Sequence, residues 1–178
     1  MIAGVDEVGR GCLAGPVIAA SVILKRPIKG LMDSKRLSSK KREDLNQIII
    51  ENSIFAIGAA DSQEIDQINI LQASLLAMQR SLEKLDMKPK KVLVDGNHIF
   101  ETSTEIEAIV GGDNLIPSIS AASIVAKVYR DKLMMAYSKE FPDYGFNKHK
   151  GYPTKLHKEM LKRYGLTRIH RRTFKGVN

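Results

Sequence analysis

The sequence has one cysteine, no tryptophan and no long apolar run, and these absences exclude several classes of protein. A single cysteine, Cys12, excludes an internal disulfide framework. No apolar segment approaches the roughly 20 residues of a membrane-spanning helix, and the N-terminus lacks the charged lead and apolar run of a signal peptide. The 178 residues, 43% of them apolar, match one domain with its own core. We therefore expect a cytoplasmic monomer.

Acidic residues are scarce at the C-terminal end. Residues 147–178 contain ten Lys or Arg against one acid, Glu159, whereas the preceding 146 residues carry 18 bases and 19 acids. The net charge of +8 therefore resides in the C-terminal part. Such asymmetry is typical of proteins that bind nucleic acid, because each neutralised phosphate releases condensed counterions. A solvated basic tail that aids solubility is the alternative.

The chain opens on an apolar strand-like stretch that leads into two adjacent acids and a glycine cluster, Gly4-Val5-Asp6-Glu7-Val8-Gly9-Arg10-Gly11. Neighbouring acids are costly to bury unless a cation compensates them, so Asp6 and Glu7 are a candidate half of a metal site. Gly9 and Gly11 allow a ligand to approach the backbone, and Arg10 offers a positive fork for phosphate. The alternative is a surface turn that the glycines only shape.

Apolar periodicity predicts alternating strands and helices along the chain. Besides the opening strand, we expect strands at 17–24, 54–60, 91–95 and 105–111. The second strand should pair with the first through the Gly15-Pro16 turn. Helices are expected at 39–52, from Asn69 to before Pro89, at 118–140 and from the cap Thr154 to Gly165.

Two further acids follow predicted strands. Asp95 ends the strand at 91–95, and Asp113 follows the strand at 105–111. Ligands of α/β sheets gather outside strand ends, so Asp95 is a candidate partner for the first acidic pair, with Asp113 as a fourth acid. A turn-forming Asp-Gly pair is the alternative for Asp95.

Several cations are candidate phosphate contacts. Lys35 precedes the helix at 39–52, where exposed helix-entry charge is the alternative. Ser123, Lys127 and Arg130 recur at i, i+4 and i+7, so one helical face presents a hydroxyl and two cations. Solvated cations, with Asp131 pairing locally, are the alternative there. The basic tail at 168–175 should also contact phosphate and position a duplex without reading its sequence.

With these residues located, the chain resembles the bacterial ribonuclease HII family. The opening GVDEVGRGCLAGPV is similar to the family signature GIDEAGRGPLAGPV, and the later blocks follow in the family's order: DSKRLS, VDGN, SAASIVAKVYRDKLM, HKGYPT and HRRTF. The resemblance implies an α/β, RNase H-like three-layer fold with a mixed central β-sheet flanked by helices. It also implies a catalytic core over 1–141 and a small basic helical C-terminal extension over 142–178, packed on the same domain.

The resemblance further implies an activity and its residues. Family members cut the RNA strand of RNA/DNA hybrids and nick duplex DNA 5′ to an embedded ribonucleotide, leaving a 3′-hydroxyl and a 5′-phosphate. Two Mg²⁺ or Mn²⁺ ions would be held during catalysis by four acids: Asp6, Glu7, Asp95 and Asp113. The loop that reads the 2′-hydroxyl matches Gly9, Arg10 and Gly11, and the tyrosine that senses the adjacent sugar matches Tyr152. Phosphates would be bound by Lys35, Ser123, Lys127 and Arg130.

Two alternatives stay open. A ribonuclease HIII-like hybrid nuclease without junction specificity shares the acids and the glycine loop, but normally carries an extra N-terminal domain, whereas this chain starts on its first strand and has Tyr152. A non-catalytic hybrid-binding module would explain the basic tail. It would not explain four acids beside a polyanion, since carboxylates repel phosphate unless metals intervene.

Overall fold

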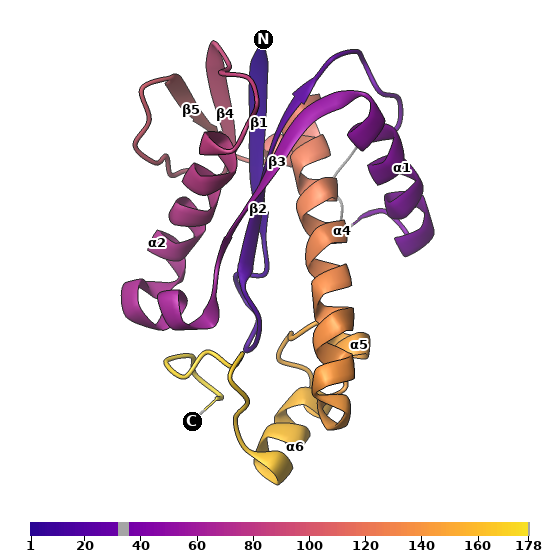
Figure 1. The fold of residues 1–178 in the computed structure, drawn as a ribbon, viewed down its shortest axis with the longest axis vertical. Coiled ribbons are helices and arrows are strands. Elements are labelled where there is room, and N and C mark those ends of the chain that lie inside the picture. Colours follow the sequence, from indigo (N-terminus) through magenta and orange to yellow (C-terminus); the bar gives the residue numbers. More distant parts are fainter. Residues whose placement is uncertain (32–35, 178) are drawn as a thin grey trace.

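The computed structural model describes residues 1–31 and 36–177. Its centre is a five-stranded sheet in the order β3-β2-β1-β4-β5 (Figure 1). Three strands, β1 (Ile2–Val8), β2 (Val17–Leu24) and β3 (Ser53–Ala60), form the antiparallel part of the sheet, in which β2 pairs with both β1 and β3. The remaining two, β4 (Lys91–Asp95) and β5 (Glu105–Ile109), run parallel to β1. The expected mixed sheet is confirmed.

Helices cover both faces of this sheet. On one side lies α2 (Ser62–Glu83), and on the other lie α1 (Ser39–Glu51) and the long α4 (Pro117–Glu140) (Figure 1). Successive side chains of β2 point to opposite faces of the sheet, as they do in any β-strand. Ile18 packs with α1 and α4, whereas Val17 packs with α2. The α/β three-layer prediction is therefore confirmed.

Close contact between α4 and β1 fixes how the helix lies across the central strand of the sheet. Gly4 of β1 has no side chain, and a Cβ there would lie 2.2 Å from the carbonyl carbon of Ser118. The buried alanines of α4, among them Ala122 and Ala126, also keep the helix low on the sheet. Residues one and two turns further along α4 are therefore held directly over the end of β1.

Some helices differ from the sequence-based expectation. The helix predicted from Asn69 begins earlier, since Asp61 caps α2 and forms a capping box with Glu64. Asn69 interrupts α2 with φ 68°, and its side chain accepts hydrogen bonds from the N–H groups of Leu71 and Gln72, so it caps the second segment from within. A short helix, α3 (Gly112–Leu115), stands where a loop was expected.

Residues 142–177 cover the end of α4 and the loop that follows β1. They form a 3₁₀ turn (Pro142–Tyr144), α5 (Phe146–His149), α6 (Lys155–Tyr164) and an irregular tail (Figure 1). The predicted cap is confirmed, because Thr154 accepts a hydrogen bond from the His157 N–H at 3.2 Å. Apolar side chains of this segment pack on Leu13, Ala14 and Met134 in one core cluster, which joins the two ends of the chain.

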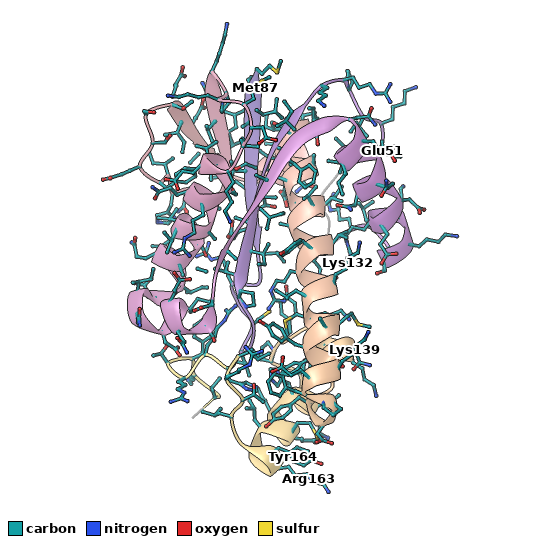
Figure 2. All side chains as sticks on the ribbon, viewed as in Figure 1. Glu51, Met87, Lys132, Lys139, Arg163 and Tyr164 are labelled. Carbon is teal, nitrogen blue, oxygen red and sulfur yellow. The ribbon has the colours of Figure 1, made fainter. Side chains whose placement is uncertain are left out.

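The tail is partly buried, which corrects the expectation that Arg171 contacts phosphate, whereas Arg172 and Lys175 are exposed. Arg171 is 0% exposed. It donates hydrogen bonds to the carbonyl oxygens of Gly9 (2.7 Å), Arg10 (2.9 Å) and Gly15 (2.8 and 3.0 Å). Arg168 is paired with Glu140. Exposed cations lie elsewhere as well, including Lys132, Lys139 and Arg163 at the surface of α4 and α6 (Figure 2).

We predict that Arg171→Met destabilises the protein by about 3 kcal/mol or more, because buried carbonyls lose their donors. For a chain of this length, the melting temperature should fall by roughly 6–12 °C in a thermal unfolding experiment. Its neighbour Arg172 is exposed, so Arg172→Met is the matched control and should change stability by less than about 0.5 kcal/mol. Equal melting temperatures for the two variants would show that Arg171 does not brace the fold.

Candidate active site

Three acids meet where neighbouring strands end. Val5 of β1 is paired with Val94 of β4, so the next residues, Asp6 and Asp95, lie side by side. Asp113 lies in the first turn of α3, shortly after β5. One carboxylate oxygen from each of Asp6, Asp95 and Asp113 lies within 4.8 Å of the others. The structure therefore brings together three of the four predicted carboxylates.

Local hydrogen bonds fix the orientation of these acids. The N–H of Glu7 donates to Asp6 Oδ1 at 2.8 Å, and the N–H of Asp113 donates to Asp95 Oδ1 at 3.3 Å. The side-chain amide of Asn114 donates to Asp113 Oδ1 at 2.9 Å, while the hydroxyl of Ser120 donates to the carbonyl of Asp113. Sequence reasoning missed both supports. The adjacency of Asn114 to Asp113 was the one available signal.

Glu7 lies near the cluster but is not one of its three converging acids. Strand side chains alternate between faces, so Glu7 does not point the same way as Asp6. Its carboxylate instead accepts a hydrogen bond from Arg10 Nη1 at 3.2 Å. Arg10 is half exposed, and its side chain remains available to a ligand at the rim of the site.

Electrostatics at the site favour a bound cation. Burial raises the pKa of Asp6 well above its ordinary value, and the charges of Glu7 and Asp95 raise it further, although a hydrogen bond from Ser123 opposes the shift. Burial also raises the pKa of Glu7, against the effect of Arg10. Crowded, oriented carboxylate oxygens are the ligands that Mg²⁺ and Mn²⁺ prefer. These residues therefore fit a divalent metal site.

The two glycines of the loop after β1 have different roles. Gly9 has φ +95°, and a Cβ on it would lie 2.2 Å from Nε of Arg130, so a protein side chain already occupies the space expected for a ligand. A Cβ on Gly11 would meet no atom within 4 Å. Gly11 is also exposed. The Gly11 backbone is therefore open on its Cβ side, whereas the Cβ side of Gly9 is filled by Arg130.

The predicted phosphate contact by Arg130 is wrong. Its side chain is 0% exposed and donates to the carbonyl oxygens of Pro16 (3.0 Å), Lys150 (2.8 Å) and Ala14 (3.0 Å). A guanidinium used in this way cannot reach a phosphate. Arg130 instead joins α4 to the two loops that flank it. Lys35, the other predicted contact before α1, lies outside the described residues.

Ser123 and Lys127 connect the acids to Tyr152. Ser123 is buried against Asp6, to which it is hydrogen-bonded. Lys127 lies one turn further along α4, a rise of about 6 Å. Its ammonium pairs with Asp131 at 2.6 Å and lies 5.8 Å from the centre of the Tyr152 ring. Successive turns of α4 therefore face Asp6 through Ser123 and the Tyr152 ring through Lys127.

Tyr152 lies half-buried in the loop between α5 and α6. Its ring packs over Lys127 and Arg130, and its side chain is within hydrogen-bonding reach of the Cys12 thiol. Burial raises the pKa of Tyr152, so its hydroxyl keeps its proton. Sequence reasoning missed the contact between Cys12 and Tyr152, because no local pattern relates residues so far apart in sequence.

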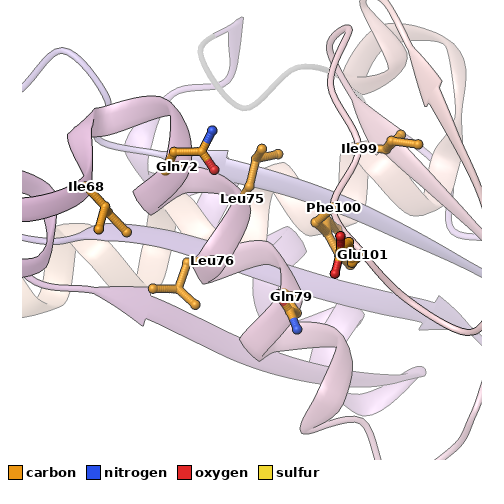
Figure 3. A pocket seen from close by; sticks show the side chains of 8 residues that line it. All are labelled: Ile68, Gln72, Leu75, Leu76, Gln79, Ile99, Phe100 and Glu101. Atoms are coloured by element: carbon orange, nitrogen blue, oxygen red, sulfur yellow. The ribbon is translucent and has the colours of Figure 1, made fainter.

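A separate hollow of about 450 Å³ lies between α2 and the segment at 99–101 (Figure 3). Apolar side chains such as Leu75, Leu76 and Phe100 dominate its lining. None of the predicted site residues lines this hollow. It is therefore no part of the acidic site.

Comparison with known proteins gives consistent matches over almost the whole chain. The family model described as Ribonuclease HII matches residues 3–177. A Ribonuclease HII of Coxiella burnetii is 54% identical over 99% of this chain and 89% of its own, and one of Borrelia hermsii is 53% identical over 99% and 100%. The crystal structure of the ribonuclease H2 of Pyrococcus horikoshii superposes with TM-score 0.81 at 28% identity, covering 99% of this chain and 94% of the other.

We predict that Mn²⁺ or Mg²⁺ raises the melting temperature of the wild-type protein. At a concentration about 100-fold above the dissociation constant, the gain should be about 2.7 kcal/mol. Asp6→Asn should melt higher than wild type in EDTA, because carboxylate repulsion is relieved, and should lose the response to metal. Glu159→Gln, which changes an exposed acid far from the cluster, is the control and should keep the response. An equal metal response in Asp6→Asn would place the metal elsewhere.

Proposed function

Since the chain belongs to the ribonuclease HII family and is a metal-dependent ribonuclease H, we propose that it incises duplex DNA 5′ to an embedded ribonucleotide as well as cutting the RNA strand of RNA/DNA hybrids. The products carry a 3′-hydroxyl and a 5′-phosphate. The observation that carries this proposal is the cluster of Asp6, Asp95 and Asp113, with Tyr152 packed near Lys127, one turn of α4 beyond the Ser123 that contacts Asp6.

In this proposal, Asp6, Asp95 and Asp113 hold two Mg²⁺ or Mn²⁺ ions, and Glu7 adds charge at the edge of the site. Bound ions supply an activated water and stabilisation of the leaving oxygen. The chain itself orients the ligands. Bonds from Asn114 and from the backbone hold the carboxylates in place before any ligand arrives, which limits the reorganisation needed during the reaction.

The substrate-reading part is proposed to be the glycine loop together with Tyr152. The 2′-hydroxyl both donates and accepts hydrogen bonds, and it distinguishes RNA from DNA. Exposed backbone at Gly11 and the half-exposed Arg10 are available to it and to the adjoining phosphate. The Tyr152 ring would lie against the following deoxyribose, where a further 2′-hydroxyl would crowd it. That contact would select the RNA-to-DNA junction.

The proposal also includes a monomeric enzyme in the cytoplasm. No helix in the described part of the chain is both long and apolar enough to cross a membrane. The one cysteine, Cys12, is a buried free thiol, which agrees with a reducing compartment.

Asp95→Asn tests the catalytic proposal. The amide keeps the shape of the side chain but removes charge from the metal site, so cleavage should fall by at least about a hundred-fold while duplex binding persists. Asp44→Asn, an exposed acid on α1, should leave cleavage unchanged. Cleavage should be followed across a metal titration on a duplex with one ribonucleotide. A folded Asp95→Asn protein with wild-type cleavage would overturn the assignment. Metal-dependent cleavage by the wild type also excludes a non-catalytic binding module.

Tyr152 tests the junction proposal. Tyr152→Ala should lose about 10- to 100-fold more activity on a single embedded ribonucleotide than on a continuous hybrid, since small misplacement of reacting atoms is costly. Tyr152→Phe should stay near wild type, because the ring still packs on the sugar. The measurement is kcat/KM on both substrates for all three proteins, with melting temperatures as the check on folding. Equal losses on both substrates would show that Tyr152 does not read the junction.

A further inference from the structure

Three of the four histidines are buried together beside Tyr152. His149 ends α5, His157 lies in the first turn of α6, and His170 lies in the tail. The rings of His149 and His157 stack with their centres 4.4 Å apart. Nε2 of His157 lies 3.0 Å from Nε2 of His170. None of these rings contacts the acidic cluster or takes part in the chemistry proposed above.

Backbone partners fix the proton positions in this cluster. Nδ1 of His170 lies 2.9 Å from the N–H of Thr167 and 2.8 Å from the Thr167 hydroxyl; because a backbone N–H can only donate, we assign Nδ1 as unprotonated and the proton to Nε2. Nδ1 of His157 faces the carbonyl oxygen of Tyr152 at 3.0 Å, and a carbonyl can only accept, so Nδ1 of His157 carries the proton. His170 Nε2–H can then donate to the bare Nε2 of His157. One directed chain of hydrogen bonds runs from Thr167 to Tyr152.

This chain of hydrogen bonds ends on the loop that carries the Tyr152 ring. The carbonyl of Tyr152 has two acceptor positions, and they are used by the N–H of Thr154 at 2.8 Å and by Nδ1–H of His157. The preceding residue, Gly151, donates its N–H to Nδ1 of His149 at 3.1 Å and accepts from the N–H of Leu13 at 2.8 Å. The backbone on both sides of the Tyr152 ring is therefore fixed by imidazole rings.

The same chain of hydrogen bonds requires that the imidazole rings be uncharged. Burial lowers the pKa of His157 and that of His170 to about 4 each, with the neighbouring imidazole adding to the shift. Burial also lowers the pKa of His149. At neutral pH all three rings are uncharged, and each N–H faces an acceptor. A second proton on either ring of the His157–His170 pair would set N–H against N–H.

We propose that His157, held in its tautomer by His170, is a positioning residue that sets the orientation of Tyr152 and thereby the preference for a single ribonucleotide over a continuous hybrid. This inference rests on the proposed reading of the junction by Tyr152. It differs from a purely structural role, in which the cluster would only stabilise the C-terminal segment and would leave substrate preference unchanged.

A pair of amide substitutions separates the two roles. In His157→Asn the amide nitrogen replaces Nδ1 and can still donate to the Tyr152 carbonyl. In His157→Gln the amide replaces Nε2 and faces His170 instead. The two variants differ by one methylene and lose comparable packing. The measured quantity is the ratio of kcat/KM on a duplex with one ribonucleotide to kcat/KM on a continuous hybrid, so that any common loss of activity cancels.

We expect His157→Asn to keep the wild-type ratio within about two-fold and His157→Gln to lower it several-fold toward the ratio of Tyr152→Ala. In a Tyr152→Ala background, His157→Gln should change the ratio no further, because coupled residues are not additive. Equal ratios for the Asn and Gln variants, with an altered ratio for Tyr152→Ala, would overturn the positioning role alone. An unaltered ratio for Tyr152→Ala would instead overturn the junction proposal, and the positioning role with it.

A measurement on the unmodified protein covers the case in which a variant fails to fold. Nitrogen-15 chemical shifts of the imidazole rings distinguish the two neutral tautomers. At pH 7 we expect His157 with its proton on Nδ1, and His149 and His170 with theirs on Nε2. A proton on Nε2 of His157 would leave the Tyr152 carbonyl without its donor and would overturn the proposal without any substitution.

Discussion

Two buried guanidinium groups bonded to backbone carbonyls hold together the loops that are proposed to contact substrate. Arg130 and Arg171 make seven hydrogen bonds to six carbonyl oxygens. Within residues 1–31 and 36–177, no carboxylate lies within ion-pair distance of either group. Burial lowers the pKa of Arg171 to about 10, so it stays charged at neutral pH. Carbonyl dipoles, not acids, therefore compensate both charges.

This arrangement follows from where the substrate-reading residues lie. The acids stand at strand ends and are held by the ladder hydrogen bonds of the sheet. The glycine loop and the Tyr152 loop are irregular, and several of their carbonyls, among them those of Gly9, Ala14 and Lys150, accept hydrogen bonds from the two arginine side chains. Buried carbonyls need donors. A guanidinium supplies five, in a rigid fork that fixes several carbonyls at once. His149 and His157 likewise each make one hydrogen bond to the backbone of the Tyr152 loop.

These long-range contacts mark the limit of what the sequence predicts. Apolar periodicity locates the five strands and the long helices, and strand ends followed by acids locate Asp6, Asp95 and Asp113. The spacing of Lys127 and Arg130 correctly puts them near one face of α4. Spacing cannot say whether that face is open, because its cover comes from residues 142–177. A buried arginine and a phosphate-binding arginine look alike in sequence. Arg171 in the basic tail was misread for the same reason.

The clustered acids lower the stability of the metal-free protein. With its pKa raised, Asp6 holds its proton longer in the folded protein than in the unfolded chain. The metal-free protein therefore loses stability as pH rises from the ordinary pKa of the carboxyl, 3.8, through the raised value. A divalent ion displaces that proton and removes the repulsion from Glu7 and Asp95. The fold keeps a destabilising group of charges at the place where a cation would restore the balance, and the two arginines bond the surrounding loops without using any of these acids.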